Sequence, residues 1–146
     1  MARPQTATLY TPRILALAVT LADFPMDEDA AFKGSARSDT CGSALELGFD
    51  MAKGGAIAMP GARVTACAIG QAAAAVFLGD ICGRTGADII RAEAQLSNWL
   101  ADTGPAPEWR DIELLDTARA YPARHGAIRL PWRAARDALC NNEGVR

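Results

Sequence analysis

The sequence predicts an α+β domain in which a three-stranded antiparallel meander packs against about five helices. The first observation behind this prediction is a change of hydrophobic period. Residues 44–51 and 56–66 alternate apolar and polar side chains, as half-buried strands do, whereas the chain after residue 68 has helical spacing. The second is composition, since 50% of the 146 residues are hydrophobic and 22% are charged, which is typical of a globular domain with its own core. We therefore predict a single domain over residues 1–146, with loose tails at 1–8 and 141–146.

The first element is expected to be a helix that begins at Thr11 and Pro12. Threonine caps helices well, and proline is tolerated in the first helical turn. Ile14, Leu17 and Leu21 then recur at helical spacing and predict one apolar face.

The meander is expected to follow. Residues 33–39 form a weak, polar strand candidate, and 44–51 and 56–66 are stronger ones. Lys53-Gly54-Gly55 predicts a hairpin turn between the last two strands, because adjacent glycines supply the positive φ angles of tight turns. Pro60-Gly61, inside the last strand, predicts a bulge or an edge irregularity.

The second half of the chain is expected to be helical. Its predicted helices are residues 69–79, 87–101, 111–120 and 123–139. The glycine- and proline-rich segment 103–107 separates the second of these helices from the third.

Cys67 falls where the last strand gives way to an alanine-rich helix. The first N–H groups of a helix lack partners, and the positive end of the helix dipole favours an anion. A thiolate here is therefore a candidate nucleophile or metal ligand, and the alternative is a small buried hydrophobe. Cys41 precedes the strand that pairs with the strand before Cys67. Because these strands are antiparallel, both cysteines are expected at the same end of the sheet.

His125, the single histidine, stands where the last helix is expected to begin. A neutral imidazole near two thiolates is a suitable third metal ligand. The alternative is a surface or capping histidine. Cys82 and Cys140 are expected to lie away from this site and to be structural or incidental.

Charge and cysteine usage exclude several classes of protein. The net charge of −2 and the pI near 5.3 argue against nucleic-acid binding and against binding to anionic membranes. No stretch reaches the roughly 18 apolar residues of a membrane span, and no secretory signal is recognised, so we expect no direct membrane insertion. Four cysteines without a Cys-x-x-Cys pair favour free thiols or metal ligands in a reducing cytoplasm.

Three short motifs, in order, resemble those of the NifU/IscU/SufU-like iron–sulfur cluster assembly scaffolds. Cys41-Gly42-Ser43 is similar to the family's Cys-Gly-Asp, and residues 65–69 (Thr-Ala-Cys-Ala-Ile) are similar to its second cysteine motif. Residues 121–124 (Tyr-Pro-Ala-Arg), through Leu-Pro-Trp at 130–132, are similar to the SufU-like version of its third. The resemblance extends over about residues 10–139.

This resemblance implies a NifU/IscU-like fold and a scaffold or carrier that is not an enzyme. It implies a transient iron–sulfur cluster or iron, with zinc as a further possibility, held by Cys41, Cys67 and His125. The implied partners are a cysteine desulfurase and recipient apoproteins.

The chain also departs from the family. Ser43 replaces the aspartate, and the third cysteine, which would fall at Gly126 or Ala127, is absent. The three remaining ligands would need completion by water, by a partner protein or by a second copy of the chain. Two alternatives therefore stay open. One is an interaction module or accessory subunit of a larger complex, with a degenerate or zinc-filled site. The other is a thiol enzyme with Cys67 as nucleophile and His125 as base.

Overall fold

The structure is a computed structural model that describes residues 9–39 and 42–143. Its elements, in chain order, are α2 (Pro12–Val19), η1 (Thr20–Asp23), β1 (Phe32–Arg37), β2 (Ala44–Met51), η2 (Lys53–Gly55), β3 (Ile57–Thr65), α3 (Ala68–Gly79), α4 (Gly86–Leu100), η3 (Ile112–Ala120), η4 (Pro122–Arg124) and α5 (His125–Glu143). The α+β prediction is confirmed. In the described residues, one antiparallel sheet with strand order β1-β2-β3 is combined with four α-helices and the nine-residue 3₁₀ helix η3, and the sheet packs mainly against α5.

The first helix begins as its sequence predicts. The Thr11 hydroxyl oxygen accepts a hydrogen bond from the Ile14 N–H at 3.2 Å, and Pro12 occupies the first turn. Ile14 is buried, and Leu17 and Leu21 pack against the core. The predicted apolar face is thus the face that the helix buries.

The strands pair in the predicted meander. Ala44 lies opposite Thr65 at one end of β2, and Met51 lies opposite Ile57 at the other. The register shifts between Gly48 and Asp50, so the predicted irregularity near residues 60–61 is confirmed. Gly54 and Gly55 both have positive φ, of 82° and 83°, which confirms the turn chemistry of the hairpin.

The first strand is shorter than predicted. It ends at Arg37. Ser38, whose N–H donates to the Ser43 carbonyl at 2.8 Å, begins the turn that leads into β2.

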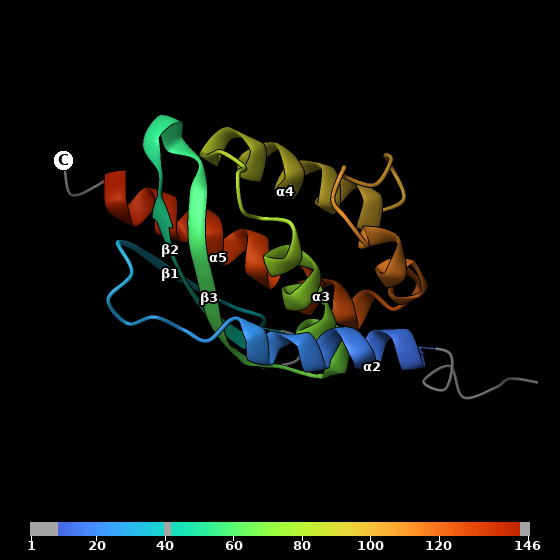
Figure 1. Cartoon of the computed structure of the whole chain (residues 1–146). Helices are drawn as coiled ribbons and strands as arrows, with labels where there is room; N and C mark the ends of the chain where they lie inside the picture. Colours follow the sequence, from blue (N-terminus) through green and yellow to red (C-terminus); the bar gives the residue numbers. More distant parts are fainter. Residues whose placement is uncertain (1–8, 40–41, 144–146) are drawn as a thin grey trace, which may run out of the picture.

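Helix α5 connects the sheet to the rest of the molecule (Figure 1). It packs along β1 and β2 and also contacts α3 and α4. The inward side chains of β2, which are Leu45, Leu47 and Phe49, are each 1% exposed. The core lies between the sheet and these helices.

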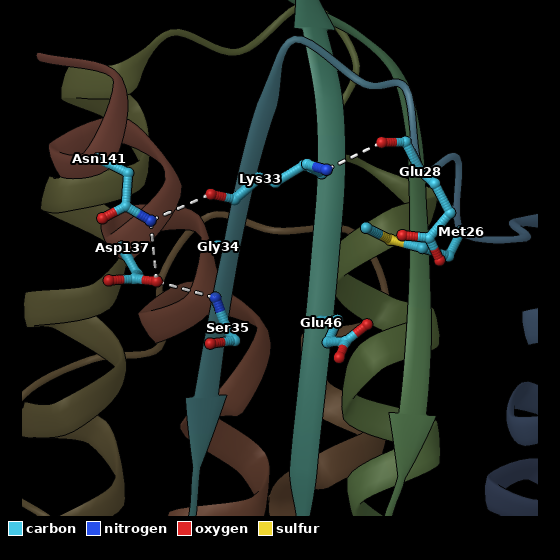
Figure 2. Close-up of a pocket in the computed structure, with 8 residues that line it drawn as sticks. All are labelled: Met26, Glu28, Lys33, Gly34, Ser35, Glu46, Asp137 and Asn141. Atoms are coloured by element: carbon cyan, nitrogen blue, oxygen red, sulfur yellow. Dashed lines mark hydrogen bonds between the residues drawn. The ribbon is translucent and has the colours of Figure 1, made fainter. Parts of the chain in front are cut away.

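The outer edge of β1 is covered by polar side chains of α5, spaced four residues apart (Figure 2). Asp137 accepts the Ser35 N–H at 2.9 Å, and Asn141 donates to the Lys33 carbonyl at 3.2 Å. Arg133 donates to the carbonyl of Arg37, also at 3.2 Å. These bonds satisfy backbone groups that an edge strand otherwise presents to another strand.

Two predictions about the helices need correction. The segment 111–120 is 3₁₀ and not α, with i to i+3 bonds such as Leu114 N–H to Asp111 carbonyl at 3.0 Å. The last helix extends to Glu143, so the predicted loose tail at 141–146 is wrong for 141–143, because Asn141 is bound to β1. The predicted tail at 1–8 lies outside the described residues, as do 144–146.

Candidate functional site

Cys67 is the N-cap residue of α3, as the sequence predicts. Its backbone is extended, with φ −66° and ψ 172°, and its carbonyl accepts the Gln71 N–H at 2.9 Å. The thiol makes no capping hydrogen bond, and the residue is half-buried. The thiol therefore lies at the start of the first helical turn of α3.

The first turn of α3 and the start of α5 approach each other through small residues. A Cβ on Gly70 would lie 2.7 Å from the Ala66 Cβ and 3.3 Å from the Ala127 Cβ. Ala127 is fully buried. Only glycine and alanine allow the backbones to come this close, so the segment after Cys67 and the start of α5 form one unit.

The turn between β1 and β2 also contacts the start of α5. Ser38 and Ser43 are 2% and 3% exposed, and the Gly42 N–H donates to the Ser38 carbonyl at 3.1 Å. A Cβ on Gly126 would lie 2.5 Å from the Ser38 Oγ. Three segments that are distant in sequence therefore meet at one end of the sheet: the β1–β2 turn, the start of α3 and the start of α5.

Cys41 itself lies outside the described residues. The reasoning that placed it near Cys67 rests on strand pairing, and the pairing of Ala44 with Thr65 confirms that the two strand ends are neighbours. The proximity of the two thiols stays a prediction.

His125 is the first residue of α5 and is half-buried. Its Nε2 lies 2.8 Å from the Arg119 carbonyl oxygen. Because a carbonyl only accepts, Nε2 is the donor of this bond, and Nδ1 is the ring nitrogen that a metal could bind. A metal-binding imidazole commonly has this arrangement, with one ring N–H held by a backbone carbonyl. The same bond also ties α5 to η3, which is the structural role for this residue.

The other two cysteines lie apart from this unit. Cys82 follows the C-terminal end of α3, opposite to Cys67, and Cys140 lies near the end of α5; both are exposed. In the part of the chain that the structure describes, no three His, Cys, Asp or Glu side chains gather as a metal site.

An open cleft of about 290 Å³ lies on the outer face of the sheet (Figure 2). Its lining residues are Met26, Glu28, Lys33, Gly34, Ser35, Glu46, Asp137 and Asn141. Glu28 and Glu46 both bind Arg63, and the Lys33 amine donates to the Glu28 backbone carbonyl. The cleft lining contains neither a thiol nor an imidazole, so we do not place the site there.

Sequence reasoning missed two residues of the unit, Ser38 and Gly70. A glycine one turn inside an alanine-rich helix was the available signal for Gly70, because glycine in a helix costs about 1 kcal/mol relative to alanine and often has a packing reason. Ser38 had no such signal, since it follows directly on a polar strand.

Comparisons with known proteins identify solved structures that share this fold. No family model matches the chain, and no curated protein matches it. Among solved structures, the N-terminal part of a nitrogen-fixing NifU-like protein from Brucella abortus matches with a TM-score of 0.86 and 27% identity, over 98% of this chain and 100% of the other. A protein from Fervidobacterium islandicum AW-1 that is described as a putative iron–sulfur cluster assembly scaffold for the SUF system matches with a TM-score of 0.79 and 21% identity, over 92% of this chain and 98% of the other.

The chain is a small α+β domain in which one end of the sheet, the start of α3 and the start of α5 meet. Its fold is like that of the NifU-like protein, and the resemblance predicted from the sequence is confirmed for the fold over nearly the whole length of the chain. Among the helices of the described residues, none is both long and apolar enough to cross a membrane.

Proposed function

We propose that the protein is a scaffold or carrier in iron–sulfur cluster assembly, which holds iron or a nascent cluster and catalyses no reaction of its own. The observation that supports this most is the convergence of the three motif-bearing segments in a chain with a NifU-like fold. Cysteine sulfur is the usual protein ligand of iron–sulfur clusters, and Cys67 lies at the start of α3, where these segments meet.

The proposed ligands are Cys41, Cys67 and His125. His125 would bind through Nδ1, because its Nε2 proton is held by the Arg119 carbonyl. A cluster iron or a zinc ion commonly has four ligands, so this set leaves one position for water, a partner protein or a second copy of the chain. A ligand set with one open position is compatible with a carrier, because a carrier must also release its cluster.

The proposed partners follow from the same role. A cysteine desulfurase would supply sulfur, and recipient apoproteins would take the cluster. A cytoplasmic location is proposed with them, because free thiols persist in a reducing compartment.

The test is the metal and acid-labile sulfide content after strictly anaerobic purification and reconstitution with iron, sulfide and a cysteine desulfurase. Iron with sulfide is expected in the wild type and is expected to be lost in both Cys41→Ser and Cys67→Ser. Cys82→Ser and Cys140→Ser are the matched controls and should retain both, because these thiols are exposed and lie apart from Cys67. A wild type that binds neither iron nor sulfide would overturn the proposal.

A second candidate is an interaction module that has kept the scaffold fold with a degenerate or zinc-filled site. It is favoured by the packing at Gly126 and Ala127, where the family resemblance expects a third cysteine and where no side chain longer than a methyl group is present. Zinc without sulfide, or stable co-purification with a large complex without metal, would favour this candidate.

A further inference from the structure

The last turn of η3 is attached to the end of α4 by one arginine side chain. Runs of 3₁₀ helix longer than three or four residues are uncommon, because their hydrogen-bond geometry is poor, and η3 has nine residues. Arg119 lies in its last turn and is half-buried. The Arg119 Nε donates to the Trp99 carbonyl at 3.0 Å, and the guanidinium lies 4.8 Å from the centre of the Trp99 ring.

The same guanidinium also binds two carboxylates. Its Nη2 donates to Asp102, just beyond α4, and its Nη1 donates to Asp116, one turn earlier in η3, both at 2.9 Å. Both aspartates are exposed, so the attraction between the charges contributes little by itself. The planar fork of an arginine instead fixes a geometry, because its donors point in set directions. These contacts restrict where the backbone of Arg119 can lie.

The backbone carbonyl of Arg119 accepts the hydrogen bond from the His125 Nε2 at 2.8 Å. Carbonyls in the last turn of a helix have no partner within that helix, so this one is available to the imidazole. Arg119 thus binds α4 through its side chain and His125 through its carbonyl. Because His125 is the first residue of α5, one chain of contacts joins the end of α4 to the start of α5.

We propose that Arg119 is a positioning residue for His125. By fixing the last turn of η3 on α4, its side chain holds the carbonyl that selects the Nε2–H tautomer and the orientation of the ring. Nδ1 is then the ring nitrogen that stays available to a ligand. The alternative is that Leu115 and Ala118, both fully buried, fix η3 without Arg119. The claim about the imidazole needs no metal, and only the claim about metal affinity rests on the proposed function.

The first test uses His125 as its own reporter, because it is the only histidine of the chain. The ring nitrogens of the full chain, without a histidine tag, are observed by ¹⁵N NMR at about pH 8.5, where an imidazole is neutral. The wild type should show one tautomer and an Nε2–H signal protected from exchange with water. Arg119→Ala should show a mixture of tautomers and lose that signal. Arg91→Ala is the matched control, because Arg91 also pairs with an aspartate three residues earlier, Asp88, but is exposed on α4.

A second variant, Arg119→Lys, keeps the test decisive if the alanine variant does not fold. Lysine retains the charge but lacks the fork, so the tautomer balance should shift in the same direction and less far. A wild-type tautomer with a protected Nε2–H signal in folded Arg119→Ala would overturn the proposal in favour of apolar packing. An unchanged imidazole in Arg119→Lys, should only that variant fold, would do the same. So would an equal change in Arg91→Ala, which would indicate a general loosening.

The second test measures affinity with Co²⁺ alone as the probe, in a double-mutant cycle of Arg119→Ala and His125→Ala. Loss of a group that supports a metal ligand commonly costs about 10- to 100-fold, so Arg119→Ala should raise the dissociation constant about tenfold or more. In the His125→Ala background it should have no effect, because Arg119 acts only through the imidazole. An equal rise in both backgrounds would overturn the positioning role. If His125→Ala leaves the affinity unchanged, the proposed ligand set fails instead, and the NMR comparison still decides the role of Arg119.

Discussion

The two ends of α3 are built from opposite kinds of residue. At the N-terminal end, which begins after Cys67, Gly70 lies close to Ala66 and Ala127, and small residues bring α3 and α5 close together. At the C-terminal end, Phe77 stacks on Trp109 at 5.5 Å and meets Trp132 edge-on at 5.2 Å. The Arg84 guanidinium lies 3.8 Å from the centre of the Trp109 ring and pairs with Asp80 at 2.8 Å.

This difference indicates that the C-terminal end of α3 contributes mainly to stability and that the N-terminal end forms the candidate site. Large buried side chains at the C-terminal end contribute apolar area and specific polar bonds, so substitutions there should act on the free energy of unfolding. The small residues at the N-terminal end bury little area but hold backbones in a narrow geometry. Substitutions there should change metal binding more than stability.

The largest effect on the free energy of unfolding is expected from Trp109→Ala. The ring is 4% exposed, contacts both Phe77 and Trp132, and donates from Nε1 to the Val76 carbonyl at 3.0 Å. Its removal should lower the free energy of unfolding by about 3–5 kcal/mol, measured by urea denaturation. The Co²⁺ bound per folded molecule should stay unchanged. A parallel loss of metal from protein that remains folded would contradict the separation of the two ends.

A smaller effect is expected from Asp80→Asn, which weakens the polar bonds at the same end. The Asp80 carboxylate accepts from the Arg110 N–H at 2.9 Å and from the Arg84 guanidinium at 2.8 Å. Removal of the charge should cost about 1–3 kcal/mol at neutral pH, because hydrogen bonds to charged groups are the stronger ones.

The cost of Asp80→Asn should depend on pH with a definite sign. Burial by itself raises the pKa of Asp80, but the Arg110 N–H and the Arg84 guanidinium outweigh it, and the pKa is lowered from its ordinary value of 3.8. The stabilisation is therefore present above pH 3.8 and is lost as the pH falls toward the lowered pKa of the folded state. The stability difference between wild type and variant should narrow over that range, and a constant difference would contradict this assignment.

The features of the fold that the sequence predicted are those that have a local signal in the sequence. Alternation in residues 44–51, paired glycines at the hairpin and a Thr-Pro helix start are local signals, and each predicted its element. The cysteine at the start of α3 was predictable for the same reason, because a strand-to-helix junction is visible in the local pattern.

The close packing around the site was not predictable in this way. Ser38 meets Gly126 across 88 positions of sequence, and nothing near either residue marks the contact. The 3₁₀ form of η3 was missed as well, since helical periodicity over nine residues does not separate it from an α-helix. Such features depend on tertiary contacts, which override local preference.

A direct comparison of the two ends is offered by the glycines of α3. Gly70→Ala places a Cβ 2.7 Å from the Ala66 Cβ, whereas Gly79→Ala places one 3.6 Å from the Arg110 guanidinium, an ordinary contact. Overpacking at position 70 should outweigh the gain in helix preference by about 0–2 kcal/mol. Co²⁺ affinity should fall in Gly70→Ala and stay unchanged in Gly79→Ala. Equal metal affinity in the two variants would mean that Cys67 does not depend on this packing.

The smallest effect on stability is expected from Cys82→Ser, just beyond the C-terminal end of α3. The residue is exposed, so the free energy of unfolding should change by no more than about 0.5 kcal/mol. The informative readout is thiol reactivity, measured by mass spectrometry after N-ethylmaleimide labelling. Cys82 should react faster than the half-buried Cys67, and Co²⁺ should protect Cys67 alone. If Co²⁺ slowed labelling at Cys82 as well, the metal would not be confined to the N-terminal end, and the assignment of function to that end of α3 would fail.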